Sequence, residues 1–333
     1  MDPLTQGALG AALPQASTRA KWVGSAGILG FLAGMAADLD VLIRSSSDPL
    51  LFLEYHRQFS HSLVFIPIGG AICALVLHAF IGRRRGLRLR QTWLFCTLGY
   101  ATHALLDACT TYGTMLLWPF SEQRFAWNTI SIIDPLFTLP LLLAVVLAAT
   151  LSKPALARWG LLWGAVYMSL GLVQRNEAMS MGYQLAAQRG HQPLRLEAKP
   201  SIGNILVWKT VYETRDRYYV DAVRAGLWPR LYIGDSVLKL DLDRDMPWLD
   251  PGSQQARDIE RFRWFSNGYI ARDPIYANRV MDIRYSMLPN EILPLWSIEL
   301  TPEAERRDHA QYRTHRDGGA DRLGILWEMM TKR

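Results

Sequence analysis

The sequence predicts an α-helical integral membrane domain of about five spanning helices with an N-terminal half-helix, followed by a smaller α+β soluble domain. Half of the 333 residues are hydrophobic, and they are concentrated in the first 175 positions. This part also carries most of the formal net charge of +6, in short basic clusters between apolar segments. The later part contains runs of aromatic and β-branched residues, which favour strands. We therefore expect a membrane domain at 1–175 and a soluble domain at 176–333.

A spanning helix needs roughly 20 apolar residues. Five segments approach this length; in order, they are Trp22–Ala37, Leu63–Ile81, Thr92–Cys109, Ile132–Leu151 and Ala157–Val173. The opening stretch Leu4–Leu13 is too short to span, and we expect it to pair with the next helix as a half-membrane hairpin. No basic region precedes this stretch, so a cleavable signal peptide is not expected.

Basic residues predict the orientation of these helices. They cluster before the first span, between the second and third, and between the fourth and fifth, at Arg19 and Lys21, at 83–90, and at Lys153 and Arg158. Such loops face the cytoplasm. The loops at 38–60 and 110–130, and everything after 175, then face outward. We expect a multi-pass inner-membrane protein with a periplasmic C-terminal domain. The charge pattern indicates membrane topology, and nucleic acid is not an expected partner.

The soluble part has the pattern of an α+β domain. Residues 204–213 and 217–223 flank a short polar turn and predict a hairpin. Residues 279–287 and 295–300 predict two more strands, and 323–330 predict a helix. The three cysteines, Cys73, Cys96 and Cys109, all lie in apolar segments without a CxxC spacing. Neither a disulfide framework nor a thiolate metal site is therefore expected.

Three pairs of ionisable residues interrupt the membrane domain: Asp38 with Asp40, His56 with His61, and His103 with Asp107. In the predicted topology all three pairs lie at the outward ends of their helices. Ionisable groups at membrane depth are costly, and a divalent cation is one compensation. Histidine and aspartate without thiolate suit zinc, with manganese or iron as alternatives. We predict that all six bind metal, as one ion or as two ions about 3.5–4 Å apart.

Each pair taken alone also fits a structural role. The two aspartates can end a helix, the two loop histidines can lie at the interface, and His103 can bond Asp107 between packed helices. Their common depth favours the metal site. His78 lies roughly 25 Å along a helix from His61, so we expect it at the opposite end. His191, His309 and His315 are expected to be surface or structural residues without ligand-like partners.

Arg57 lies between the two loop histidines, where an arginine would repel a bare metal ion. Its guanidinium stays charged and suits an anionic partner such as a phosphate or carboxylate. The alternatives are a lipid headgroup or an acidic side chain. We expect Arg57 to contact substrate.

Several motifs carry a family resemblance: "MDPLTQGALG", "AADLD", "HRQFSHS", "HALLDACTTYG" with "WPF", and "SIIDPLF". They resemble the YdjM-like family of inner-membrane proteins, described as metal-dependent hydrolases, over roughly residues 1–175. That family is remotely similar to zinc-dependent phospholipase C and single-strand nuclease folds. The resemblance implies the same six aspartate and histidine ligands. Many relatives have histidine where this chain has Gln6, which bears on the occupancy of one metal position.

These observations favour a membrane-bound metal-dependent hydrolase. The metal lowers the pKa of water, Asp40 or Asp107 accepts the proton, and Arg57 stabilises the anionic transition state. A phosphate ester of a lipid or envelope precursor is the expected substrate, because the site opens at headgroup level. The expected partners are therefore membrane lipid and a small-molecule or lipid phosphate. One alternative is a metal- or proton-coupled transporter. Another is a non-catalytic membrane protein with a structural metal.

Overall fold

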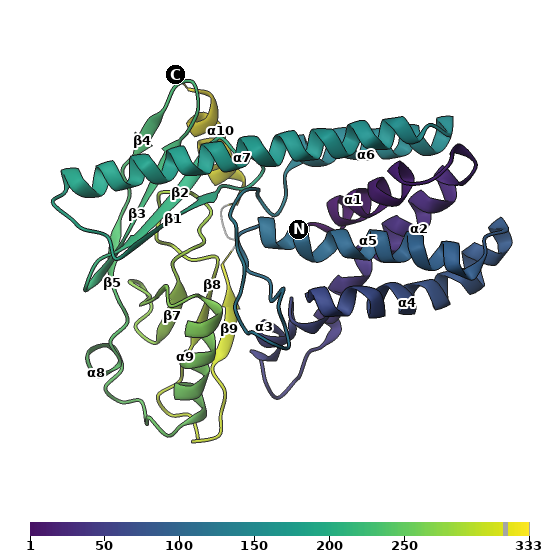
Figure 1. The fold of residues 1–333 in the computed structure, drawn as a ribbon. Coiled ribbons are helices and arrows are strands. Elements are labelled where there is room, and N and C mark those ends of the chain that lie inside the picture. Colours follow the sequence, from purple (N-terminus) through teal and green to yellow (C-terminus); the bar gives the residue numbers. More distant parts are fainter. Residues whose placement is uncertain (316–318, 333) are drawn as a thin grey trace. The chain divides into compact units, whose positions relative to one another are not determined.

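The computed structural model describes residues 1–315 and 319–332, and the chain forms two compact units. The first unit is helical and comprises Met1–Leu42, Tyr55–Val173 and Ile202–Asn204. The second comprises Ile43–Glu54, Gln174–Ser201 and Ile205–Arg333, and it contains the strands (Figure 1). The short segment 43–54 thus belongs to the strand-containing unit, although it lies between helical segments of the first unit in the sequence.

The first unit is built from α1 (Pro3–Ala16), α2 (Val23–Met35), α4 (Ile66–Leu77), α5 (Leu89–Cys109), α6 (Pro135–Leu151) and the first part of α7 (Pro154–Gln188). Helix α1 packs against α2, α5 and α6, and α5 also packs against α2 and α4. A proline begins α1, and Asp2 caps it by accepting a hydrogen bond from the backbone N–H of Thr5. The expected pairing of the opening helix with its successor is present.

Three helical stretches are long and apolar enough to cross a membrane: Ala20–Leu42, Leu63–Arg85 and Pro154–Gln188. The stretch Leu63–Arg85 exposes large apolar side chains, such as Leu75 at 64% and Phe80 at 65%. Lipid would cover these side chains, since exposed apolar faces of this extent are unfavourable in water. The other two expected spans form α5 and the shorter apolar helix α6. A helical membrane part is therefore supported, and the total of five spans remains a prediction.

Glycines allow α1, α2 and α5 to approach closely. A Cβ atom at Gly30 of α2 would lie 2.3 Å from the carbonyl oxygen of Gly10 in α1. A Cβ atom at Gly99 of α5 would lie 2.4 Å from the carbonyl oxygen of Gly30. Small residues at such crossings let helix backbones touch, which is a common packing device between membrane helices. These contacts determine how near α5 comes to the end of α2.

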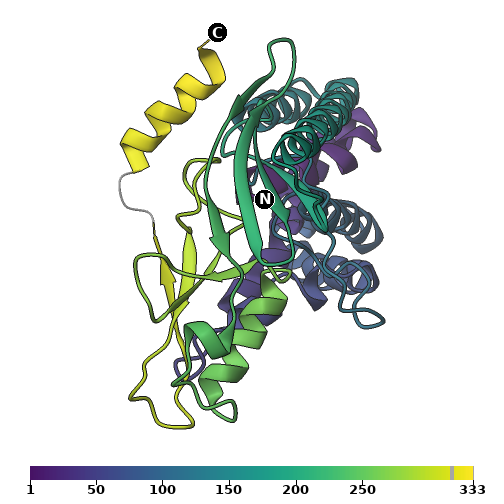
Figure 2. The same cartoon turned by 90° about the vertical axis from the view of Figure 1, so that its left-hand side faces the viewer.

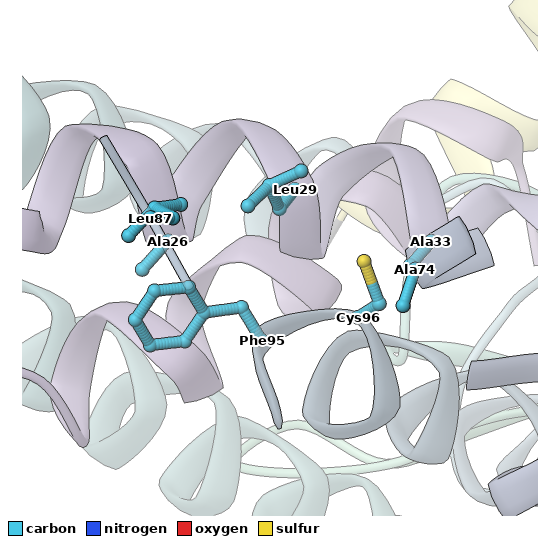
Figure 3. Packing of buried hydrophobic residues seen from close by; sticks show 7 residues of the cluster. All are labelled: Ala26, Leu29, Ala33, Ala74, Leu87, Phe95 and Cys96. Carbon is cyan, nitrogen blue, oxygen red and sulfur yellow. The ribbon is translucent and has the colours of Figure 1, made fainter. Parts of the chain in front are cut away.

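An apolar cluster fills the space where α2, α4 and α5 meet (Figure 3). Its buried members are Ala26, Leu29, Ala33, Ala74, Leu87, Phe95 and Cys96. These side chains interact by van der Waals packing, because none of them has a charged group. The cluster therefore stabilises the three-helix arrangement, and the polar residues are left to the helix ends.

The second unit contains two antiparallel sheets (Figures 1 and 2). In the first, the order is β1 (Arg195–Pro200), β2 (Val207–Glu213), β3 (Arg217–Arg224) and β4 (Arg230–Tyr232), with β5 (Ser236–Leu238) also paired to β3. In the second, the order is β6 (Ile270–Arg272), β7 (Arg279–Asp282), β8 (Trp296–Glu299) and β9 (Gln311–Thr314). The helices are α8 (Leu242–Asp245), α9 (Gln254–Phe265) and α10 (Gly319–Thr331).

The predicted elements of this unit are confirmed. The hairpin expected at 204–213 and 217–223 is β2 with β3, paired so that Thr210 faces Asp221. The two further strands are β7 and β8, and the terminal helix is α10. Strand β1 was not predicted.

Charged residues occupy part of the core between the sheets. Apolar residues of β2 and β3 pack against those of β6 and β7 in one cluster. Beside it, Lys199 pairs with Glu197 and Arg284 pairs with Asp282, with both basic side chains about 5% exposed or less. The Nζ atom of Lys209 donates to Ser286 Oγ and to the carbonyl of Glu291. This core therefore combines apolar packing with satisfied buried charges.

Candidate metal centre

The six predicted ligands come from three segments of the first unit. They are Asp38 and Asp40 in the 3₁₀ segment Ala36–Leu42 that continues α2, His56 and His61 before α4, and His103 and Asp107 on α5. Residues four positions apart share one face of a helix, so α5 presents an imidazole and a carboxylate together. The structure brings all six into two overlapping groups.

The first group consists of Asp38, His61, His103 and Asp107, whose ligand atoms all lie within 4.8 Å of one another. The two Nε2 atoms of His61 and His103 are 2.9 Å apart. Asp38 Oδ1 lies 3.5 Å from the first and 3.4 Å from the second, and Asp107 Oδ2 lies 3.2 Å from His61 Nε2. The side chains of His61, His103 and Asp107 are fully buried. Four potential ligand atoms thus converge on one point.

Hydrogen bonds at the far side of each imidazole orient these atoms. Nδ1 of His103 lies 2.5 Å from the carbonyl oxygen of Gly34, so it must carry the proton and donate. Nδ1 of His61 lies 3.0 Å from Ser60 Oγ and 3.2 Å from Asp40 Oδ2, and because Ser60 Oγ donates to that carboxylate, Nδ1 carries the proton here as well. In the neutral rings both Nε2 atoms then present lone pairs to the shared point. Carboxylates and carbonyls behind histidine ligands are the usual arrangement at metal sites.

This donor set fits a divalent cation. Two facing lone pairs between two carboxylates repel one another unless a proton or a metal cation lies among them. Two Zn–N bonds of about 2.0–2.1 Å at a tetrahedral angle hold their nitrogens about 3.3 Å apart. The observed 2.9 Å would need to open by about 0.4 Å. That is a small side-chain adjustment.

The pKa of His61 reports the same preference for positive charge. Burial alone would lower the pKa of this imidazole, but contacts with three carboxylates outweigh burial and raise it to about 10. At His56 burial prevails and lowers the pKa, although Asp40 opposes it. The lowered pKa favours the neutral imidazole at His56, which is the form that ligates metal.

The second group consists of Asp38, Asp40 and His56, and it shares Asp38 with the first. A carboxylate common to two groups is suited to bridge two cations. Asp40 is heavily hydrogen-bonded: Oδ1 lies 2.7 Å from His56 Nδ1, and Oδ2 accepts from Ser60 Oγ at 2.7 Å. It also accepts from the backbone N–H of Arg57 at 3.0 Å. Asp40 thus holds the segment 56–61 in place as well as facing the site.

Arg57 is fixed beside the first group. Its Nε atom lies 3.0 Å from Asp107 Oδ2, and Nη1 donates to Thr110 Oγ1 at 3.0 Å. The guanidinium also lies over the ring of Tyr112, 4.9 Å from its centroid. The backbone of Arg57 has φ +66°, which is uncommon for a residue with a side chain. Of the alternatives considered from the sequence, an acidic contact is therefore present.

Gln6 also lies at the site. Its Nε2 donates to Asp107 Oδ1 at 2.8 Å, and the side chain is fully buried. The amino group of Met1 contacts the same carboxylate oxygen. Position 6, where the family resemblance implies a histidine, thus adjoins the first group. In this chain it orients Asp107 instead of offering a ring nitrogen.

Some functional neighbours were not predicted. Ser60 bonds Asp40, Tyr100 donates to the backbone carbonyl of Ser60 at 2.7 Å, and Thr110 bonds Arg57. Ser60 and Thr110 fall within the quoted motifs "HRQFSHS" and "HALLDACTTYG", so their proximity to the ligands was a usable signal. Tyr100 carries no such signal, because aromatic residues are common in apolar helices.

The remaining histidines lie outside both groups. His78 bonds Thr92 Oγ1, His191 contacts the hydroxyl of Tyr212, and His315 contacts Ser297 Oγ. These contacts are structural, as expected. For His309 the expectation of no ligand-like partners was wrong. Its Nδ1 lies 3.0 Å from Asp258 and 3.7 Å from Asp48, because the segment 43–54 folds onto the second unit.

Comparison with known proteins decides the family. The profile of the YdjM inner membrane protein family matches residues 1–178, which include all six ligands. The chain belongs to this family. Inner membrane protein YbcI of Escherichia coli (strain K12) is 37% identical over 108 residues, which cover 31% of this chain and 60% of YbcI. The uncharacterized protein YfhP of Bacillus subtilis (strain 168) is 29% identical over 152 residues, covering 44% of this chain and 45% of YfhP.

These matches support the location of the protein in the inner membrane, and they do not identify a reaction. This YdjM-family chain spans 60% and 45% of the two relatives' lengths, and neither printed name states an activity. No solved structure matches. Family membership and the apolar helices together support an inner-membrane protein. Most of the second unit lies beyond the matched residues.

Proposed function

We propose that this protein is a membrane-bound metal-dependent hydrolase that acts on a phosphate ester of a lipid or envelope precursor. The observation that carries the proposal is the shared carboxylate of Asp38, which joins two groups of ligands beside the buried arginine Arg57. Paired cation sites with an adjacent cationic side chain are suited to phosphoester hydrolysis. Family membership supports the membrane location and leaves the reaction to be tested.

The ligands would hold a divalent ion, with zinc as first choice and manganese or iron as alternatives. When bound, such an ion supplies Lewis-acid polarisation of a phosphoryl oxygen and lowers the pKa of water toward neutrality. The protein provides the geometry for this chemistry. Asp40 and the carbonyl of Gly34 fix the two imidazoles, and burial of His61, His103 and Asp107 excludes bulk water.

The proton acceptor is a carboxylate of the site. Asp107 contacts Arg57 and Gln6, and Asp40 accepts from Ser60 and the histidines, so both are largely engaged. Asp38 makes the fewest such contacts, and its side chain is 21% exposed. As the ligand common to both groups, however, Asp38 would have its oxygens occupied by the cations. We therefore keep proton transfer at Asp40 or Asp107, the residues that the sequence favoured.

Arg57 would stabilise the anionic substrate. Its Nε and Nη1 atoms are engaged with Asp107 and Thr110, and Nη2 donates no hydrogen bond within the described residues. Nη2 is thus the donor that remains for a phosphate oxygen. The contact with Asp107 and the ring of Tyr112 hold the guanidinium in one orientation, so little side-chain entropy is lost when an anion binds.

The substrate class follows from the predicted location. We propose that the ligands lie at the outer ends of their helices and that the C-terminal domain is periplasmic, because the basic loops alternate with the ligand-bearing ones. A site at this depth would meet phosphate groups of lipids or lipid-linked envelope precursors. Small soluble phosphate esters would reach it from the same side.

The proposal is tested by turnover in detergent or nanodiscs. Wild type loaded with zinc or manganese is assayed on p-nitrophenyl phosphate, bis(p-nitrophenyl) phosphate and a phosphatidic acid. Turnover that chelator abolishes and His61→Ala lowers by at least about 100-fold is expected, since ligand loss removes the activating ion. His78→Ala is the matched control, because His78 bonds Thr92 outside both groups. Metal binding without turnover on any of these substrates would reject the enzyme and leave a structural metal.

A further inference from the structure

The segment that leads into the ligand His56 is held by the second unit. The chain leaves the first unit after Leu42, just beyond Asp40, and returns at Tyr55, immediately before His56. Between these points, Ile43–Glu54 is part of the strand-containing unit and includes most of the short helix α3 (Leu51–Tyr55). Two ligands of the second group, Asp40 and His56, therefore flank a segment whose position depends on another part of the fold.

One arginine of α9 anchors this segment. Arg261 forms a bidentate ion pair with Asp48, with Nη2–Oδ2 at 2.8 Å and Nη1–Oδ1 at 3.0 Å. Its Nε donates to Glu54 Oε1, and Nη1 also donates to Asp258 Oδ1 at 2.9 Å. The guanidinium thus joins three carboxylates from two parts of the sequence. We call these four residues, Asp48, Glu54, Asp258 and Arg261, the α9 clamp.

The clamp is partly shielded from water. The side chain of Arg261 is 19% exposed, that of Asp48 is 22% exposed, and that of Asp258 is fully buried. Bidentate ion pairs that are shielded from water hold their side chains in a more specific geometry than exposed single contacts do. The arrangement therefore fixes the direction in which the segment runs as well as its location.

Apolar contacts support the same anchoring. Leu50 is fully buried and Leu53 is 2% exposed. The ring of Phe52 meets that of Tyr312 in β9 edge to face, with centroids 5.1 Å apart. Removal of Arg261 alone would accordingly loosen the segment without releasing it. This matters for the experiment, because such a variant should still fold.

The anchored segment ends next to the strained backbone of Arg57. Glu54 is two residues before His56 and three before Arg57, whose φ is +66°. Such a conformation persists only where the surroundings hold it. The N–H of Arg57 bonds Asp40 and its carbonyl accepts from Met115. Just before it in the sequence, His56 Nδ1 lies 2.7 Å from Asp40 Oδ1, and the next side-chain anchor is the pairing of Glu54 with Arg261.

We propose that Arg261 is a positioning residue through which the C-terminal unit controls the second cation position, formed by Asp38, Asp40 and His56. This inference rests on the proposed metal site. Loss of the clamp allows the segment before His56 to move, which misplaces His56 and the backbone bond to Asp40. The first group is anchored by α5 and the contact of His103 with Gly34, so it keeps its affinity. The C-terminal unit thereby supports binding of the second ion selectively.

The test compares Arg261→Ala with Arg263→Ala in the full-length protein. Arg263 lies on the same helix and its side chain pairs with the exposed Glu260 of that helix, so it is a matched control. Cobalt titration followed by visible absorption measures the two binding steps. We expect Arg261→Ala to weaken the second step by about 10–100-fold and leave the first unchanged, as for other residues that orient ligands. Arg261→Lys, which keeps the charge but loses the fork, should recover part of the affinity.

Hydrogen–deuterium exchange of residues 55–58, without metal, separates this inference from the metal site itself. Faster exchange there in Arg261→Ala, but not in Arg263→Ala, supports the clamp whether or not wild type binds cobalt. Failure of wild type to bind cobalt would reject the proposed function alone. Unchanged exchange would overturn the clamp. Faster exchange with two unchanged cobalt affinities would overturn its control of the second position. Asp48→Asn provides a second route if Arg261→Ala does not fold.

Discussion

Replacing Gly99 with alanine should separate α5 from α2 and weaken the metal site. The added Cβ would lie 2.4 Å from the carbonyl oxygen of Gly30, whereas ordinary contacts of this kind are 3.4–4 Å. The three nearest atoms at this point, the O, Cα and C atoms of Gly30, belong to the backbone and cannot rotate away as a flexible side chain can. The two helices must therefore move apart by about 1 Å at this crossing, a shift large enough to disturb packing.

This displacement reaches the ligands along α5. His103 lies one helical turn beyond Gly99, or about 6 Å along the axis, and Asp107 lies one turn further. Metal–ligand distances tolerate only about 0.2 Å, so a shift of about 1 Å relative to Asp38 is several times too large. Overpacking of this kind typically costs about 1–3 kcal/mol of folding free energy. Metal affinity should fall by at least about tenfold.

Thermal unfolding in detergent, with and without zinc, measures both effects. Gly24→Ala is the control, because an added Cβ there meets nothing within 4 Å. It should be neutral or stabilising by up to about 1 kcal/mol, since alanine favours helix more than glycine does. Gly99→Ala should unfold at a lower temperature and gain less stability from zinc. If the two variants behave alike, the close glycine crossing does not position the site.

Three further predictions concern separate parts of the protein. Arg57→Lys keeps the charge but loses the planar fork, so turnover should fall by about 1.5–3 kcal/mol of transition-state stabilisation while metal content is kept; unchanged kinetics would reject the substrate role. Burial lowers the pKa of Lys209 to about 7, so the unfolded chain binds more protons between pH 7 and about 10. Stability of the C-terminal unit should therefore rise with pH across that window and become flatter in Lys209→Met, as urea unfolding at several pH values would reveal. A reporter that is active only after export, fused after position 333, should be active; activity of a cytoplasmic reporter there would reverse the topology.

The site was predictable because helix geometry brings its residues together. His103 and Asp107 follow the four-residue repeat of a helix, and Asp38 and His61 lie at the ends of apolar segments. Such ends share a depth when helices cross a membrane together. The spacing therefore indicated a common site before any contact was known. Some hydrogen bonds that orient the ligands, such as the one from His103 Nδ1 to the carbonyl oxygen of Gly34, involve backbone atoms. Residue spacing in the sequence does not predict them.

The second unit was predictable where its strands are apolar. Strands β2 and β3 carry runs of β-branched and aromatic residues, and their hairpin was predicted. Strand β1 was missed because Glu197 and Lys199 face the core as an ion pair. Charged residues at alternate positions usually indicate a solvent-facing side, and the pairing that makes their burial tolerable is tertiary.

The assignment of 43–54 to the second unit could not have been predicted. It depends on Arg261, which lies more than 200 residues after Asp48 in the sequence. The segment itself combines serines and a proline with the apolar run 50–53, one basic residue and two acidic residues. Long-range ion pairs of this kind are set by the fold and not by local spacing.

The metal content of the purified protein tests the central claim most directly. Wild type, His61→Ala, His103→Ala and the control His78→Ala are purified without chelator, reloaded with zinc or manganese, desalted and measured by elemental analysis. At least one ion per chain is predicted in wild type and in His78→Ala, with a large loss in the two ligand variants. Equal, near-zero metal in all four proteins would contradict the metal centre on which the proposed function rests.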